Sequence, residues 1–248
     1  SSSVQNPSYA FPTDGSYTVE LIVTTANGCK DTATGPIDIF PMPTADFTFI
    51  NACIGTAIDF TDNSSTTSGT INNWDWNFGN TNTSIIQNPS ENYATEGVYN
   101  VQLIATSSNG CKDTIAKAIE VWPTPVVNFS PTEVCLNALT QFNDLSTVSN
   151  NSTTNTVTGW SWNFNGLGSS STQNPTFTFT NEGVIPTTLI VTTNNGCTDS
   201  VTLNVTVNPL PVISFGPDTA GCSPVCYTIT NSSSISSGTL DVFSWNFG

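Results

Sequence analysis

The sequence predicts an all-β protein built from tandem two-sheet sandwiches, and three observations lead to this fold class. The first is composition, because 37% of the 248 residues are hydrophobic and 10% aromatic while only 8% are charged. A chain rich in Val, Ile and Thr and poor in Lys, Glu, Met and Ala favours strands over helices. The second is a long internal repeat, and the third is a two-residue alternation of apolar side chains within that repeat. We therefore expect almost no helix, and several small cores instead of one large core.

The internal repeat divides the chain into four segments. A stretch that begins with Gln-Asn-Pro and ends in Asn-Gly-Cys starts at Gln5, Gln87 and Gln173, and a Trp-Asn-Phe stretch starts at Trp76, Trp162 and Trp245. The boundaries are short and rich in proline, which favours stiff, extended connections and predicts an elongated rod. The chain is expected to be an interior fragment of a longer one. The predicted segments are the C-terminal half of a repeat (1–42), two complete repeats (43–123 and 124–209) and the N-terminal half of a repeat (210–248).

The strands of one repeat follow from short β-rich runs that turn residues separate. In the last long run, Tyr99, Val101, Leu103 and Ala105 alternate with other side chains, which predicts one buried face and one exposed face. The Asn-Gly pair after this run predicts a two-residue hairpin turn. About seven such strands in a repeat of this length fit a two-sheet sandwich. The runs are, in order, 44–50, 57–62, 71–78, 97–108 and 113–122.

Tryptophans recur at the same place in each repeat. Trp74, Trp76 and Phe78 share one face of a strand, since side chains two residues apart point the same way. We expect the middle tryptophan to fill the core between the sheets. The alternative is an aromatic platform that stacks on sugars and uses Trp74 and Trp160. The predicted core tryptophans are Trp76, Trp162 and Trp245.

Charge and missing residue types exclude several classes of function. The net charge is −15, with three basic residues against 18 acidic ones, so nucleic acids and anionic membranes would be repelled. We find no run of 18 apolar residues and no cationic, apolar N-terminal segment, which argues against membrane insertion. The sequence has no histidine, so it contains no Ser-His-Asp or Cys-His arrangement. We predict that the protein is not an enzyme.

The repeated motifs resemble those of the PKD domain, an Ig-like sandwich. Its pattern is a W-x-F-G-D-G turn, then N-P-x-H-x-Y, then G-x-Y-x-V-x-L, and residues 74–80 and 87–103 follow it with Asn80 in place of the aspartate. The tyrosine of this pattern is expected to be replaced in the following repeat at Phe177. The Asn-Gly-Cys-Lys-Asp-Thr ending is similar to PKD repeats in very long secreted surface proteins of Bacteroidetes, including gliding adhesins.

The resemblance implies a structural, non-catalytic protein, namely the stiff stalk or filament of a bacterial adhesin that is extracellular and lies at the cell surface. The alternative is a spacer or carbohydrate-binding module of a secreted enzyme that degrades polysaccharides or proteins. Neighbouring repeats of the same long chain are the expected partners. Exposed edge strands also allow lateral association into filaments. No nucleic acid and no membrane insertion are expected.

Six of the seven cysteines are periodic, which favours disulfides in an oxidising compartment. Pairing within a repeat would join Cys53 to Cys111 and Cys135 to Cys197, and reduced, buried thiols are another alternative. In an Ig-like sandwich, however, the turn before the second strand and the hairpin turn between the last two strands lie at opposite ends, roughly 30 Å apart. A disulfide needs Cα atoms within about 7 Å, which argues against pairing within a repeat. We therefore predict an inter-repeat bond between Cys53 and Cys197. The cysteines predicted to pair outside the fragment are Cys29, Cys111, Cys135 and Cys222.

Two further kinds of site are considered. An aspartate before a hydroxyl residue and an aliphatic one is similar to the O-glycosylation pattern of Bacteroidetes, although a strand with a polar outer face gives the same alternation. Calcium bound between repeats by acids such as Asp62 and Asp144 is the one cofactor considered, against the alternative of solvated surface acids. The candidate glycosylation residues are Thr32, Thr114, Ser200 and Thr219.

Overall fold

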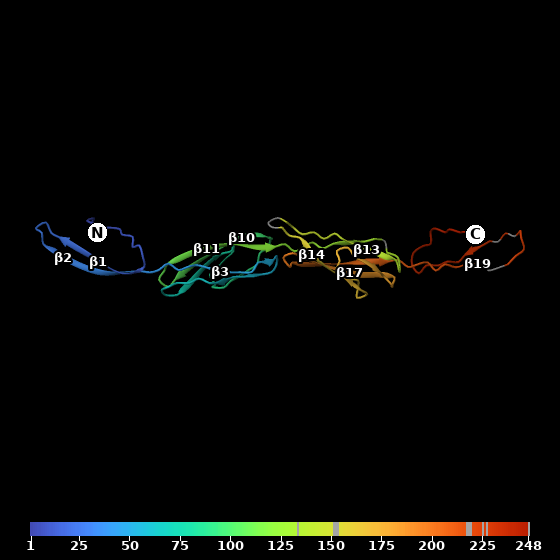
Figure 1. Cartoon of the computed structure of the whole chain (residues 1–248), viewed down its shortest axis with the longest axis horizontal. Coiled ribbons are helices and arrows are strands. Elements are labelled where there is room, and N and C mark those ends of the chain that lie inside the picture. Colours follow the sequence, from blue (N-terminus) through green and yellow to red (C-terminus); the bar gives the residue numbers. More distant parts are fainter. Residues whose placement is uncertain (133, 151–153, 217–219, 225, 227, 248) are drawn as a thin grey trace. The chain divides into compact units, whose positions relative to one another are not determined.

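The computed structural model describes residues 1–248 except 133, 151–153, 217–219, 225, 227 and 248. All of the regular elements in the described part are β-strands, as the composition predicts (Figure 1). The chain divides into two compact units, Ser1–Trp122 and Pro123–Gly248. Within the described residues, no helix is long and apolar enough to cross a membrane.

The first complete repeat lies in unit 1 and has a large sheet that the hairpin of β10 (Gly97–Ser107) and β11 (Lys112–Trp122) dominates (Figure 1). The turn of this hairpin contains Gly110, whose φ of 80° favours glycine. The smaller layer consists of two strand pairs, Phe47–Thr48 with Thr61–Asp62 and Ile58–Asp59 with Ser90–Glu91. The large sheet has the order β4 (Ala52–Cys53), β11 (Lys112–Trp122), β10 (Gly97–Ser107), β7 (Ile71–Asn77) and β8 (Thr83–Ser84). The smaller strands are β3 (Phe47–Thr48), β5 (Ile58–Asp59), β6 (Thr61–Asp62) and β9 (Ser90–Glu91).

The core of this repeat lies between the two layers. Trp76 is 2% exposed and pairs across the ladder with Leu103 of β10. From the smaller layer, the Phe47 ring meets Trp76 edge to face with centroids 5.1 Å apart, and Phe60 also packs on it. Trp74 is half-buried against the same cluster. The alternating aromatic stripe therefore faces the interior.

Two expected strands are shorter in the structure than in the sequence-based prediction. The run 57–62 divides into β5 and β6 at Phe60, whose backbone N–H donates to Pro89 O at 2.9 Å. The run 44–50 keeps only β3 and a bridge from Thr44 to Ser65. The run 57–62 changes partner at Phe60, from Ser90–Glu91 to Phe47–Thr48, so no single ladder continues through it. The run 44–50 keeps one partner segment, but the backbone N–H of Asp46 donates to Ser64 Oγ at 3.2 Å, which interrupts the ladder between Thr44 and Phe47.

The second complete repeat, in unit 2, has the same architecture. Trp162 is 1% exposed and Phe179 is fully buried, and Phe142 lies between them in the core. Phe179, not Phe177, occupies the place of Tyr93, because each lies four residues after its proline, Pro175 and Pro89. The expected replacement at Phe177 was therefore wrong. The sheets are β15 (Ser169–Ser170), β14 (Val157–Asn163), β17 (Gly183–Thr193) and β18 (Thr198–Val207), and β12 (Phe129–Pro131), β13 (Leu139–Asp144) and β16 (Thr176–Thr178).

The terminal segments contain fewer strands. Segment 1–42 holds the hairpin of β1 (Gly15–Thr24) and β2 (Lys30–Ile39). Segment 210–248 holds, among its described residues, only β19 (Phe215–Gly216) and β20 (Thr230–Asn231). Trp245, expected in a core, is 41% exposed, because the described part of this segment has no second sheet to cover it.

Candidate functional site

Cys53 lies at the end of its repeat where the chain leaves. β4 runs parallel to the last residues of β11, and Cys53 is directly opposite Trp122. The bond from Ile54 N to Trp122 O, 2.8 Å long, continues this pairing. Cys53 is therefore fixed beside the last strand residue before the next repeat begins.

Cys111 lies at the opposite end, beside the entry of the chain. It directly precedes β11, whose 11 residues extend for roughly 33 Å. The backbone N–H of Ala45, near the start of the repeat, donates to Asp113 Oδ2 at 2.8 Å, which places the entry next to this turn. Because a disulfide needs Cα atoms within about 7 Å, the geometry argues against pairing Cys53 with Cys111.

The second repeat shows the same arrangement. Cys135 forms a parallel bridge with Asn208, just beyond the end of β18, whereas Cys197 directly precedes the start of that strand. The length of β18 again separates the two cysteines of one repeat. Cys53 and Cys197 are both disulfide-bonded in the structure. Cys29, Cys111, Cys135, Cys222 and Cys226 carry free thiols.

A polar cluster centred on Asp62 joins three segments of the first complete repeat. Its Oδ2 accepts hydrogen bonds from Trp74 Nε1 at 2.7 Å and from Gln87 Nε2 at 3.1 Å. Its Oδ1 accepts from the backbone N–H of Ser64 at 3.0 Å. The backbone N–H of Asp62 donates to Asn88 Oδ1 at 2.8 Å. The Gln-Asn pair of the repeated motif thus holds the strand that carries Asp62.

Asp144 centres the same cluster in the second repeat. Trp160 Nε1 and Gln173 Nε2 donate to its Oδ2 at 2.7 and 3.2 Å, and its own N–H donates to Asn174 Oδ1 at 2.8 Å. Sequence reasoning missed this cluster, although its signal was the recurrence of an acid with a downstream tryptophan and a Gln-Asn pair.

These contacts bear on the calcium alternative. The carboxylates of Asp62 and Asp144 already accept internal hydrogen bonds, so a cation would have to displace them. Over the described ranges, no group of three or more His, Cys, Asp or Glu side chains is arranged to hold a metal. The clusters are therefore best described as hydrogen-bond networks that join separate segments of one sandwich.

Trp74 and Trp160 do not form an open sugar platform. Each is half-buried against the core of its repeat, and each indole N–H points to an aspartate. The aromatic faces that a sugar would stack on are thus partly covered by neighbouring side chains.

Two groups in the first complete repeat have shifted pKa values. Lys117 Nζ donates to Asp46 Oδ1 at 2.6 Å, and this hydrogen bond lowers the pKa of that carboxyl. Tyr93 donates its hydroxyl to Phe78 O at 3.0 Å, and burial raises the pKa of this phenol well above its ordinary value. The first interaction joins the residue before Phe47–Thr48 to β11, and the second joins the segment after β7 to the segment after Ser90–Glu91.

The candidate glycosylation residues occupy one register position in the three hairpins. Thr32, Thr114 and Ser200 are exposed, and they pair with Ile22, Ile104 and Ile190 across their ladders. Their hydroxyls are open to a modifying enzyme, as an acceptor residue requires. Thr219 lies outside the described residues.

The two complete repeats are tandem β-sandwiches, each with one cysteine at either end of its last strand. The PKD domain family matches residues 41–121 and 122–207. The chain belongs to this family. PKD domains are generally non-catalytic modules, typically extracellular, and we conclude that the chain is a repeat or spacer module of this kind.

Several solved structures are similar to parts of the chain. The PKD1 domain of Vibrio anguillarum Epp is 25% identical, with a TM-score of 0.32, and the match covers 34% of this chain and 96% of that domain. The PKD1 domain of the Vibrio cholerae metalloprotease PrtV is 31% identical, with a TM-score of 0.31 and coverage of 33% and 98%. Fibronectin(III)-like modules of Clostridium thermocellum CbhA are 15% identical, with a TM-score of 0.36 and coverage of 68% and 95%. No curated protein matches the chain.

Proposed function

We propose that the chain is a section of a stiff stalk or filament on a bacterial cell surface, in which a disulfide from Cys53 to Cys197 clasps consecutive repeats. One observation carries this proposal: within a repeat, the two periodic cysteines lie at opposite ends of the last strand. Cys53 lies beside the residue at which the chain leaves its repeat, and Cys111 lies beside the point of entry.

This arrangement suits bonds between repeats. In a tandem chain the exit of one repeat continues into the entry of the next, so an exit cysteine has an entry cysteine as its natural neighbour. Cys53, an exit cysteine, and Cys197, an entry cysteine, are each disulfide-bonded, which supports a bond of this kind. By the same rule, the free thiols of Cys29, Cys111, Cys135 and Cys222 pair with further repeats of a longer chain.

A clasp changes the mechanics of the stalk. Small interfaces between domains of one chain normally permit bending. A covalent bond beside the peptide linker removes that hinge, so the stalk transmits force along its length. A disulfide of this kind typically contributes about 2–4 kcal/mol, which across two repeats partly takes the form of stiffness.

Two surface properties belong to the same proposal. Glycans on Thr32, Thr114 and Ser200 would coat one position of every hairpin, and an intact mass equal to that of the bare polypeptide would reject this modification. Lateral pairing through exposed edge strands would bundle the rods into thicker filaments.

The other candidate is a spacer or carbohydrate-binding module of a secreted enzyme. Cysteines at both ends of every repeat favour the stalk, because such a set is used fully only in a long array. The half-buried positions of Trp74 and Trp160 also give little support to sugar binding.

Small-angle X-ray scattering of the oxidised chain tests the stalk. We expect an extended particle with a narrow distribution of maximum dimension, and a broader distribution after Cys53→Ser. Cys111→Ser is the matched control, because it removes a free thiol at the other end of the same repeat and should leave the distribution unchanged. An equally broad distribution for the unmodified chain and for Cys53→Ser would reject the stiff stalk.

A further inference from the structure

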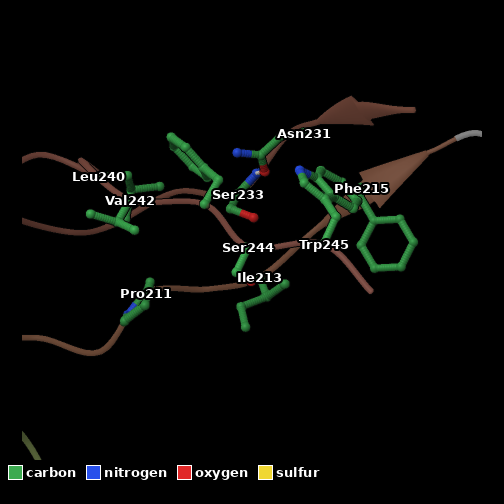
Figure 2. A pocket seen from close by; sticks show the side chains of 10 residues that line it. Pro211, Ile213, Phe215, Asn231, Ser233, Leu240, Val242, Ser244 and Trp245 are labelled. Carbon is green, nitrogen blue, oxygen red and sulfur yellow. Dashed lines mark hydrogen bonds between the residues drawn. The ribbon is translucent and has the colours of Figure 1, made fainter. Parts of the chain in front are cut away.

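A complete repeat shows which of its surfaces stay free, because both of its layers are present. In segment 210–248, by contrast, the described residues provide no second layer, so Phe215 and Trp245 line an open groove (Figure 2). The matching residues of the first complete repeat, Phe47 and Trp76, are buried in its core. What this repeat leaves unpaired is one edge of its large sheet.

The free edge belongs to β11. β10 pairs with β11 along nearly the whole strand, whereas on the other side β4 reaches only Val121 and Trp122. A side chain adds one contact there, because Asn51 Oδ1 accepts the backbone N–H of Glu120 at 2.9 Å. Among the described residues, no strand pairs with this side of β11 from Lys112 to Glu120.

Every second residue of β11 directs its backbone groups toward this edge. The backbone N–H of Glu120 and the carbonyl of Trp122 both bond on the free side. Since neighbouring residues of a strand point their backbone groups to alternate sides, every second residue before them offers unused N–H and C=O groups there. The central residues of this set are exposed, namely Thr114, Ala116 and Ala118.

The charges along this edge are self-complementary. The chain has three basic residues against 18 acidic ones, so two copies repel each other least where lysines lie, and two of the three, Lys112 and Lys117, are on β11. Lys112 and Glu120 lie four residues on either side of Ala116, on the face opposite the core residue Ile119. An antiparallel copy of β11 centred on Ala116 therefore places each Lys112 opposite the Glu120 of its partner.

Lys117 does not oppose this pairing. An inward-pointing lysine on an edge strand usually discourages pairing, because its charge would be buried without a partner. Here the Lys117 ammonium donates to Asp46 Oδ1 at 2.6 Å and to the carbonyl of Phe47. Its charge is thus compensated within the repeat, and pairing of the edge buries no free charge.

The corresponding strands of the other two hairpins each lack one of these features. β2 has Lys30 and Asp38 at the two charged positions, but Pro36 between them removes a backbone donor from the edge. β18 has threonine at both positions, Thr198 and Thr206. Among the three hairpins, β11 thus combines an uninterrupted row of donors with opposite charges at its two ends.

We propose that two copies of this chain pair through the β11 edges of their first complete repeats, antiparallel and centred on Ala116. The two large sheets then form one continuous sheet across a twofold axis, with Thr114 of one copy opposite Ala118 of the other. The contact is isologous, so it closes at a dimer and joins two stalks side by side. This inference deepens the lateral association of the proposed function and rests on it, whereas the bond between Cys53 and Cys197 is independent of it.

Sedimentation velocity of the 248-residue chain tests the pairing, with unglycosylated protein because a glycan on Thr114 would crowd the contact. We expect a species of twice the 26.2 kDa monomer that forms with rising concentration and persists in a reductant. Ala118→Pro should abolish this dimer, because it removes an outward donor at the position that Pro36 occupies in β2. Asn204→Pro is the matched control, since it makes the same change at the same position of β18 and should leave the dimer intact.

Charge reversal gives a result that loss of folding cannot imitate. Lys112→Glu places like charges opposite each other twice in the dimer, and so does Glu120→Lys, so each variant alone should dimerise about tenfold more weakly. In a mixture, the two variants carry opposite charges at both pairs of facing positions, so a 1:1 dimer should return.

Several outcomes would overturn the proposal. These are a monomer at every concentration, association that Ala118→Pro leaves unchanged, equal loss in both proline variants, and a mixture of the charge variants that associates no better than either alone. None of them affects the bond between Cys53 and Cys197, which disulfide mapping tests separately, so failure of the pairing is distinct from failure of the stalk.

Discussion

Trp160 donates its indole N–H to the Asp144 carboxylate at 2.7 Å, and Trp74 makes the same bond to Asp62 in the preceding repeat. At the matching places of the last segment, Asn231 and Phe243 replace both partners together. The donor and the acceptor are thus present together or absent together, as expected if the bond is a structural unit of the repeat.

Replacing Asp62 with alanine should destabilise the first complete repeat by about 1–3 kcal/mol, because three donors lose their acceptor and the Trp74 N–H is partly buried. Hydrogen exchange followed by mass spectrometry reports on this repeat separately from the next, and faster exchange is expected in β7 and β10. Asp75→Ala, on β7 next to Trp74, is the control and should leave exchange unchanged. Equal effects of the two variants would show that a lost surface charge, not the cluster, is responsible.

Thr187→Val should stabilise the second complete repeat. The Thr187 side chain is fully buried, and its hydroxyl finds no hydrogen-bond partner among the described residues. Val101 stands at this position in the preceding repeat and is equally buried. Removing an unsatisfied hydroxyl from an isosteric side chain is expected to give about 1–2 kcal/mol.

Urea unfolding of the Thr187→Val variant measures this gain as a higher urea midpoint for the second complete repeat. Thr206→Val, on the exposed outer face of β18, is the matched control and should change the midpoint little. A stabilisation common to both variants would indicate a general preference for valine in strands.

Tyr93→Phe should change how stability depends on alkaline pH. Burial raises the pKa of the Tyr93 phenol above its ordinary value of 10.0, so the unfolded chain loses this proton first as pH rises. The unfolded state then binds fewer protons than the native state, and stability falls from about pH 10 upward. Phenylalanine removes this dependence and loses the bond to Phe78 O, worth about 0.5–1.5 kcal/mol.

The variant is therefore expected to be less stable at neutral pH and to lose the difference as pH rises above 10. Urea midpoints at pH 7 and at successive alkaline values measure both effects. A constant difference between Tyr93 and the variant across this range would contradict a buried, neutral phenol.

Much of the sandwich could be predicted from the sequence because period-two alternation records burial directly. Trp76 and Phe78 lie two residues apart and face the same core. The Asn-Gly pair correctly predicted the turn that connects β10 to β11. The alternation cannot show where a segment changes partners, which is why the run through Phe60 was expected as one strand. The position of the replaced tyrosine was also missed, since Phe177 and Phe179 both fit an aromatic pattern.

The Asp62 cluster was not predicted for a different reason. Its members come from three segments, and only the folded chain brings Gln87 and Trp74 to one carboxylate. Asp62 was considered as a calcium ligand because an isolated acid carries no sign of its partners. The separation of Cys53 from Cys111 within one repeat could be predicted, because the length of the strand between them exceeds the distance that a disulfide spans.

Disulfide mapping of the unreduced protein tests the clasp between consecutive repeats most directly. Cleavage after glutamate separates Cys53 from Cys111 at Glu91 and Glu96, and separates Cys135 from Cys197 at Glu182. After blocking of free thiols, we predict that the peptide with Cys53 is joined to the peptide with Cys197, and that fragmentation assigns the bond to these two residues. A bond from Cys53 to Cys111, or alkylation of Cys53 without reduction, would contradict the account.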